Sequence, residues 1–227
     1  MPRTIPFSSG LGFASRLNRR AAASRLAAIG REFHRRGWAL GTSGNYSAVL
    51  SRNPLRLLIT SSGLDKSLLT ERGFLEIDAQ SNLLAGKGKP SAETALHLMV
   101  ARMREDAGCI LHTHSVWNTL LSERYARQGG FAVCGYEMLK GLEGVRSHDH
   151  REWLPIFGND QDVAALAQKV EMELERDAAA HGFLIGGHGL YTWGAGLAEA
   201  RRHVEIFEFL LEVVGRRESR LEPAASQ

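Results

Sequence analysis

The spacing of hydrophobic positions divides the chain into helices and strands. Residues 14–36 carry apolar side chains at the spacing of an amphipathic helix, which Gly37 ends. The same spacing predicts a helix after Pro90-Ser91, a helix over 116–127, a helix capped by Asn159-Asp160, and a closing helix over 197–214. Short apolar runs predict strands at 45–50, 55–60, 74–78, 109–114, 131–133, 154–157, 183–185 and 189–193.

The order of these elements favours one domain. Arg52-Asn53-Pro54 separates the first two strands and has the composition of a hairpin turn. Strands outnumber crossover helices in the first third of the chain, which predicts a single-domain α/β fold with a central mixed/antiparallel β-sheet flanked by α-helices. The domain is expected over residues 14–216, between a flexible leader at 1–13 and a flexible tail at 217–227.

Composition and charge exclude several classes of protein. The 227 residues are 44% hydrophobic and 23% charged, as in an ordinary globular chain, and a net charge of +3 argues against a nucleic-acid binder. No apolar run approaches the roughly 20 residues of a membrane-spanning helix. Six arginines and no acid precede Glu32, which fits a solvated helix face with a frayed leader, or a transit peptide. Cys109 and Cys134 are expected to be free thiols in a reducing cytoplasm.

His112-Thr113-His114 is the first candidate for metal chemistry. Alternate residues of a strand share a face, so the two imidazoles can converge on one ion while Thr113 points the other way. The apolar residues that precede them carry the strand toward the core, where neutral histidines need partners. Two polar residues on a solvated strand are the alternative.

A catalytic zinc ion needs a third protein ligand and an open position. His188 is the candidate, because the glycines on both sides of it imply a sharp turn or a close backbone approach. Five other histidines have simpler explanations. Capping or surface roles are expected for His34, His181 and His203, and a solvated loop for His148 and His150.

Three loops of small residues are candidates for binding an anion: Gly41–Asn45, Thr60–Gly63 and Pro90-Ser91. Each offers backbone N–H groups and hydroxyls, although each is also typical of a turn or a helix cap. Together with the HxH strand, they fit a phosphorylated substrate presented to a metal.

Two carboxylates are candidates for proton transfer. Glu93 is expected in the first turn of the helix after Ser91, where it would also complement the helix dipole. Glu137 lies in a mostly apolar segment, where burial would raise its pKa toward the useful range. An ion pair with Lys140 is the structural alternative for Glu137.

In this order, the motifs resemble the class II aldolase/adducin family of zinc-dependent sugar-phosphate enzymes over roughly residues 15–215. The matching segments are Gly-Thr-Ser-Gly-Asn at 41–45, Thr-Ser-Ser-Gly at 60–63, Pro-Ser-Ala-Glu at 90–93, His-Thr-His at 112–114 and the His188 loop. Within the family, residues 135–141, 155–162 and 187–194 most resemble the dehydratases of methionine salvage.

The resemblance implies a class II aldolase-like fold and a homotetramer with active sites at subunit interfaces. It also implies one Zn²⁺ per subunit, held by His112, His114 and His188. The residues that it places near the substrate phosphate are Gly44, Asn45, Ser62, Gly63, Ser91 and Lys140.

The same resemblance leaves the acid/base residue open. By this resemblance, the family's aldolases use the glutamate that matches Glu93, beside the metal. Its dehydratases instead use the glutamate that matches Glu137 as the acid/base. This chain has both. It departs from some dehydratases in having Thr94 where they carry a cysteine.

The expected reaction is dehydration of a phosphorylated ketose, 5-methylthioribulose 1-phosphate, to 2,3-diketo-5-methylthiopentyl 1-phosphate. Zinc would stabilise the enediolate, while a carboxylate removes the C3 proton and protonates the departing C4 hydroxyl. One alternative is a class II aldolase or pentulose-phosphate 4-epimerase acting on fuculose, rhamnulose or ribulose phosphate. The other is a non-enzymatic module like the adducin heads, against which the three histidines argue.

Overall fold

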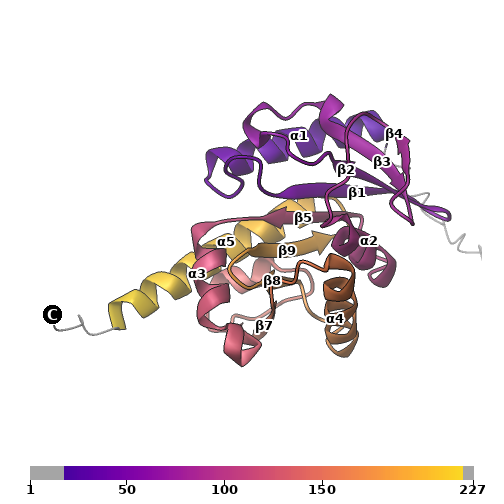
Figure 1. The fold of residues 1–227 in the computed structure, drawn as a ribbon. Coiled ribbons are helices and arrows are strands. Elements are labelled where there is room, and N and C mark those ends of the chain that lie inside the picture. The colour runs from indigo at the N-terminus through magenta and orange to yellow at the C-terminus, as the bar shows by residue number, and fades with distance from the viewer. Residues whose placement is uncertain (1–17, 222–227) are drawn as a thin grey trace, which may run out of the picture.

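A nine-stranded β-sheet forms the centre of the computed structural model, which describes residues 18–221 (Figure 1). The strands lie in the order β4-β3-β2-β1-β5-β9-β8-β7-β6, and all neighbours are antiparallel except β7 and β8. The predicted mixed sheet is confirmed, and the unpredicted β4 forms one edge. The bounds are β1 Asn45–Arg52, β2 Leu55–Thr60, β3 Phe74–Asp78, β4 Leu83–Ala85, β5 Cys109–Thr113, β6 Gly130–Val133, β7 Glu152–Phe157, β8 Gly182–Ile185 and β9 Gly189–Gly194.

Helices cover both faces of this sheet (Figure 1). Alternate residues of β2 show the two sides, because Leu57 and Ile59 pack in the cluster that includes α2 and α4, whereas Leu58 packs beneath α1. α3 and α5 lie on the α1 side. The helices are α1 Arg19–Arg35, α2 Thr94–Met103, α3 Val116–Arg124, α4 Val163–Arg176 and α5 Leu197–Leu221, with 3₁₀ turns η1 Lys66–Leu68, η2 Glu71–Gly73, η3 Ala126–Gln128 and η4 Glu137–Gly141.

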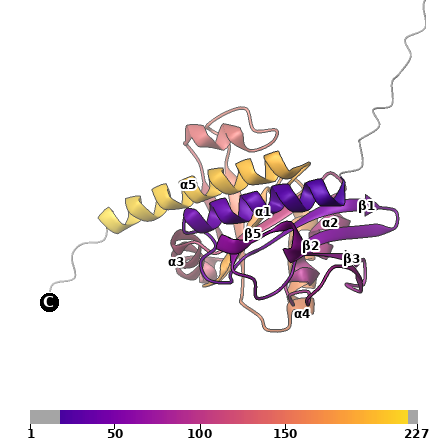
Figure 2. The same cartoon turned by 90° about the horizontal axis from the view of Figure 1, so that it is seen from above.

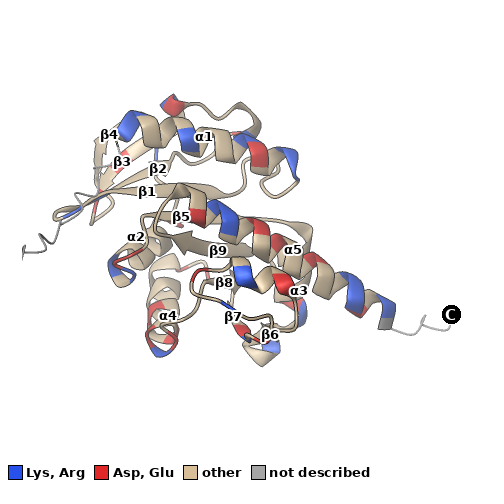
Figure 3. Ribbon diagram, turned by 180° about the vertical axis from the view of Figure 1, so that it is seen from behind, with Lys and Arg blue, Asp and Glu red and all other residues tan. Residues whose placement is uncertain are grey.

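Helices α1 and α5 run next to each other across one face of the sheet (Figure 2). Ion pairs join them, at 2.8 Å between Glu32 and Arg201 and 3.1 Å between Arg36 and Glu205. Basic and acidic residues are interspersed along α5, whereas α1 is basic apart from Glu32 (Figure 3). From residue 18 onward, the arginines of this excess are exposed, and Arg19 and Arg20 pair with Glu76 and Glu71. The predicted leader at 1–13 lies outside the described residues.

Three predicted boundaries are wrong. Asp162, rather than Asn159-Asp160, caps α4, because its side chain accepts the backbone N–H of Ala165 at 3.0 Å. The helix expected over 116–127 ends at Arg124 and continues as η3. Residues 217–221, expected in the flexible tail, belong to α5. α5 continues through Gly215, where a side chain would collide with the ring of Trp117.

Both cysteines are free, Cys109 buried and Cys134 exposed, as the sequence predicts. Within residues 18–221, every helix is too short or too polar to cross a membrane.

Candidate metal centre

Strand β5 places His112 and Thr113 on opposite faces of the sheet. The His112 ring is fully buried and stacks on Tyr191 of β9, with ring centroids 3.9 Å apart. Thr113 points to the α5 side and donates its hydroxyl to Glu208 at 2.9 Å. His114 lies just beyond the strand, in a bridge to Ala39, and its ring centroid is 4.5 Å from that of His112. The two imidazoles therefore lie together and Thr113 points to the opposite face, as the HxH pattern predicts.

The turn between β8 and β9 brings His188 to the same place. Its ring centroid lies 4.5 Å from that of His114 and 5.1 Å from that of His112. A Cβ atom at Gly189 would lie 2.2 Å from the carbonyl oxygen of Thr113, so only glycine lets β9 approach β5 this closely. Nδ1 of His188 lies 3.3 Å from the amide oxygen of Asn159, which orients the ring.

Glu93 completes a cluster of four residues, which we call the His/Glu cluster: Glu93, His112, His114 and His188. Glu93 Oε1 lies 2.9 Å from Nε2 of His188 and 3.5 Å from Nε2 of His112. Glu93 occupies the N-cap position of α2 rather than its first turn, and its side chain forms no capping hydrogen bond. Its carboxylate is therefore directed at the histidines and not at the helix end.

The donor set of the His/Glu cluster fits a divalent metal ion. Nδ1 of His112 donates to the carbonyl oxygen of Leu190 at 2.9 Å, which leaves Nε2 of the neutral ring free to bind. Nε2 of His114 lies 2.8 Å from Nε2 of His112. Burial lowers the pKa of His112 and lowers that of His114 to about 3, so both rings are neutral.

Glu93 supplies the negative charge of the cluster. Burial raises the pKa of its carboxyl, but the adjoining His112 and His188 rings outweigh burial and hold the pKa below its ordinary value. The carboxylate is therefore ionised. Imidazole nitrogens with one carboxylate oxygen form a typical donor set for zinc and related ions.

A buried polar chain behind Glu93 was not identified from the sequence. The Asn45 amide donates to Glu93 Oε2, His97 Nε2 donates to the Asn45 amide oxygen, and Ser47 Oγ donates to His97 Nδ1 at 2.8 Å. Burial lowers the pKa of His97 to about 3, which keeps the ring neutral, as these bonds require. The available signal was the spacing, since His97 lies one helical turn beyond Glu93.

A cavity of about 210 Å³ adjoins the His/Glu cluster. The hydrogen bond from the backbone N–H of Ser62 to the carbonyl oxygen of Lys89, at 2.9 Å, ties two of the predicted anion loops together. At Gly44, φ is +76° and a Cβ atom would lie 2.8 Å from the carbonyl oxygen of His112, so glycine brings the third loop against β5. The cavity lining includes Glu93, His114 and the predicted phosphate residues Gly44, Asn45, Ser62, Gly63 and Ser91.

Lys66 also lines this cavity, a role that the sequence pattern did not predict. Its side chain is 1% exposed, and Nζ donates to the carbonyl oxygens of Thr42 at 3.0 Å and Leu64 at 2.8 Å. Burial lowers its pKa to about 8. No carboxylate of residues 18–221 forms an ion pair with it. The one sequence signal was a lysine three residues after the Thr60–Gly63 loop.

Glu137 and Lys140 lie apart from the His/Glu cluster. Glu137 is on η4, its side chain is 73% exposed, and Oε1 accepts a hydrogen bond from Lys140 at 2.6 Å. This bond lowers the pKa of Glu137. The expectation of burial and a raised pKa is therefore wrong, because the segment lies over α5 at the surface, and the alternative of an ion pair is confirmed. Within the described residues, neither side chain contacts the cluster.

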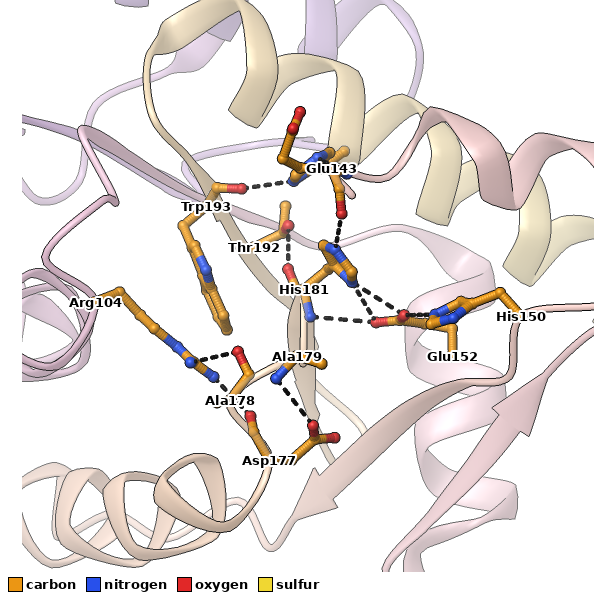
Figure 4. A network of polar contacts seen from close by, with 11 residues as sticks. Arg104, Glu143, His150, Glu152, Asp177, Ala178, Ala179, His181, Thr192 and Trp193 are labelled. Carbon is orange, nitrogen blue, oxygen red and sulfur yellow. Dashed lines mark hydrogen bonds and ion pairs between the residues drawn. The ribbon is translucent and has the colours of Figure 1, made fainter. Parts of the chain in front are cut away.

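A second polar cluster lies at the other end of β8 (Figure 4). Glu152 is 2% exposed and lies between His150 and His181, while the buried His203 bridges Trp193 and Glu143. The surface or capping roles expected for His181 and His203 are wrong, because both rings are largely buried, whereas His150 keeps a partly exposed side chain. The sequence could not show that His203 of α5 and Glu143, in the segment before β7, would lie against His181.

Comparison with known proteins places the chain among sugar-phosphate enzymes. The family model described as "Class II Aldolase and Adducin N-terminal domain" matches residues 24–214. A protein named methylthioribulose-1-phosphate dehydratase from Pseudomonas fluorescens (strain Pf0-1) is 45% identical over 86% of this chain and 93% of its own length. One of the same name from Sorangium cellulosum is 40% identical over 85% of this chain and 90% of its own. The solved structure of an L-fuculose 1-phosphate aldolase superposes with a TM-score of 0.73 at 21% identity, covering 91% of this chain and 90% of that one.

Proposed function

Because the chain belongs to the class II aldolase and adducin N-terminal domain family, we propose that it dehydrates 5-methylthioribulose 1-phosphate to 2,3-diketo-5-methylthiopentyl 1-phosphate in methionine salvage. The observation that carries the proposal is the His/Glu cluster beside a cavity lined by three anion loops and a buried lysine. Relatives named for this dehydration, at up to 45% identity over most of the chain, support it. We place the reaction in the cytoplasm, where both free thiols stay reduced.

The cavity would hold the phosphate end of the substrate. Backbone N–H groups and hydroxyls of the loops at Gly44, Ser62 and Ser91 can donate to phosphate oxygens. The Lys66 ammonium supplies a positive charge. Two of its three protons go to backbone carbonyls, and the third, which has no partner among the described residues, is available to a phosphate oxygen. The sugar oxygens then lie toward the His/Glu cluster, which shares Glu93 with the cavity.

His112, His114 and His188 would hold one Zn²⁺ per subunit, with Glu93 as a further ligand before substrate enters. When bound, the ion acts as a Lewis acid that polarises the C2 carbonyl and makes the C3 proton acidic. Asn45 and His97 hold the Glu93 carboxylate in place. Since the amide nitrogen of Asn45 is occupied by Glu93, we assign Asn45 to positioning as well as to the phosphate loop.

Dehydration needs a carboxylate that takes the C3 proton and returns a proton to the C4 hydroxyl, which leaves as water. The resulting enol then becomes the 2,3-diketone. Glu93 lies in the His/Glu cluster, whereas Glu137 contacts only Lys140 and His148 among the described residues. We propose Glu137 as the acid/base, with Lys140 near the phosphate. Both would come from a neighbouring subunit of a homotetramer.

The surface beside the His/Glu cluster supports a subunit contact there. Helix α3 begins two residues after His114, and its Val116 and Leu120 are 66% and 48% exposed. They lie one turn apart on one helix face, where large exposed apolar residues are typical of an interface. A second copy of the chain on this face could bring Glu137 to the cluster.

Product analysis by NMR tests the function. Zinc-loaded protein is expected to convert 5-methylthioribulose 1-phosphate to the diketone, and chelation is expected to stop the reaction until zinc is restored. The alternative is an aldolase or a 4-epimerase, with which the position of Glu93 beside the metal site is also compatible. This alternative is tested with fuculose, rhamnulose and ribulose phosphates. An aldehyde fragment or an epimer from these sugars, with no diketone from the first, would refute the dehydration.

A further inference from the structure

Three potential donor atoms meet at the end of β8 opposite His188 (Figure 4). Nε2 of His150 lies 2.8 Å from Oε2 of Glu152, and Nδ1 of His181 lies 3.0 Å from the same oxygen. Glu152 opens β7 and His181 immediately precedes β8, so the parallel pairing of these strands places the two residues side by side. Strand β8 separates this group from His188, and it is therefore distinct from the His/Glu cluster.

The orientation of His181 matches that of a metal ligand. Its Nε2 lies 2.8 Å from the carbonyl oxygen of Glu143, to which a ring N–H donates. That bond directs Nδ1 at Glu152. Histidines that bind metals commonly donate their other ring N–H to a backbone carbonyl in this way. In the His/Glu cluster, His112 has the same arrangement toward the carbonyl of Leu190.

The charge around Glu152 favours a cation. The carboxylate is 2% exposed, and within residues 18–221 only His150 and His181 form ion pairs with it. Arg104 reaches the same region, but it donates to the carbonyl oxygens of Ala178 and Asp177, at 2.7 Å and 2.8 Å (Figure 4). A buried carboxylate needs a compensating positive charge. Burial lowers the pKa of His181, but Glu152 outweighs burial and raises it, so a proton on that ring meets the need in metal-free protein and an ion between these donors takes its place.

The site is open to solvent on one side. His150 and His181 line a cavity of about 690 Å³, whose lining also includes Asp149, and the His150 side chain is 30% exposed. An ion can therefore enter, and water can fill a fourth position. Two imidazoles and one carboxylate suit zinc-like ions, whereas calcium and magnesium prefer oxygen ligands alone.

We propose that His150, Glu152 and His181 form a second divalent-cation site for a zinc-like ion. The bound ion fastens the end of the segment between β6 and β7 to the start of β8. The base of that segment is closed by the hydrogen bond from the Gly135 N–H to the His148 carbonyl, at 2.9 Å. This segment contains η4, so the second ion also restricts the motion of Glu137 relative to the sheet.

Metal stoichiometry tests this site. The full-length chain, freed of metal by a chelator, is titrated with Zn²⁺ by calorimetry and with Co²⁺ by visible absorption. The wild type is expected to bind two ions per chain. His188→Gln keeps the second site alone and is expected to bind one Co²⁺ with the absorption of a four-coordinate ion. His150→Gln keeps the first site alone.

His150→Gln is the decisive variant, because the ring is partly exposed and, among residues 18–221, its one side-chain hydrogen bond goes to Glu152. Metal affinity typically falls by roughly 10–100-fold when a residue that hydrogen-bonds a metal ligand is lost. Because His150 would itself be a ligand, the affinity of the second site is expected to fall by more than this. Asp149→Asn, in the same cavity, is the matched control and should keep both ions. One ion in the wild type, two in His150→Gln, or an equal loss in Asp149→Asn would overturn the proposal. Metal content is read without substrate, so failure of the dehydration leaves this result interpretable.

Discussion

Oε1 of Glu93 lies 2.9 Å from Nε2 of His188, and this contact joins the start of α2 to the turn between β8 and β9. Without it, three imidazoles would face one another with no negative charge among them. The carboxylate makes the group a site for a cation and is itself held by Asn45.

Glu93→Gln is therefore expected to weaken metal binding by at least about 10-fold, because it keeps the size of the side chain and removes the charge. Competition with a coloured chelator measures the affinity. Glu71→Gln is the control, since Glu71 lies on η2 and, in the described part of the chain, pairs only with exposed Arg20. Equal affinities in the two variants would remove Glu93 from the metal site.

Glu137→Gln is expected to lower kcat by about 100–10,000-fold, the usual contribution of a general acid or base, with no change in metal content. If Glu137 acts from a neighbouring subunit, an inactive Glu137→Gln chain and an inactive His188→Gln chain should complement each other. Random mixing in one oligomer would restore about a quarter of the wild-type activity.

The complementation has a clear negative result. No recovery in a mixture that forms mixed oligomers would show that both residues must belong to one chain. Full activity of Glu137→Gln alone would end its assignment as the acid/base.

Lys66→Met is expected to raise KM by about 10–100-fold, with a smaller effect on kcat, because one charge-assisted bond to the phosphate is lost. Since the pKa of Lys66 is lowered to about 8, the free enzyme loses this charge as pH rises through that value. Wild-type KM should therefore rise above about pH 8, and KM of the variant should not.

KM, rather than stability, separates this role from a structural one. Lys66→Met also removes the donor to the carbonyl oxygens of Thr42 and Leu64, so its melting temperature is expected to fall, and the rise in KM is the change that a structural role alone would not produce. A lower melting temperature together with an unchanged KM would contradict the assignment. Lys169→Met, at an exposed pair on α4, is the control.

Glu208→Gln is expected to change how stability depends on pH. Burial raises the pKa of Glu208 to about 7, so between its unfolded value and pH 7 the folded chain keeps a proton that the unfolded chain releases. The free energy of unfolding therefore falls as pH rises through this window, by up to about 3 kcal/mol. Glutamine removes this contribution while still accepting from Thr113.

Urea unfolding of metal-free protein between about pH 5 and 8 measures the effect. The variant should match the wild type at the low end and exceed it at the high end. Glu173→Gln, on α4 and paired with exposed Arg176, should follow the wild type throughout. Parallel curves for Glu208→Gln and the wild type would contradict the raised pKa.

The sequence alone determined most of the strands, the helix periodicity and the candidate ligands. Alternation along a strand is a local property, so His112-Thr113-His114 already implied two imidazoles on one side and a hydroxyl on the other. Glycine likewise marks backbone geometry directly, which is why the residues around His188 indicated a close approach that Gly189 makes.

Only the tertiary structure decided which polar groups are buried and which meet. Burial of Lys66 and His97 depends on loops and helices far along the chain, and so does exposure of Glu137, which its apolar neighbours suggested would be buried. The pairing of β7 with β8 brings His150, Glu152 and His181 together, although nothing in their spacing announces it. The pKa of a side chain and its partners follow from this surrounding packing, which local pattern does not contain.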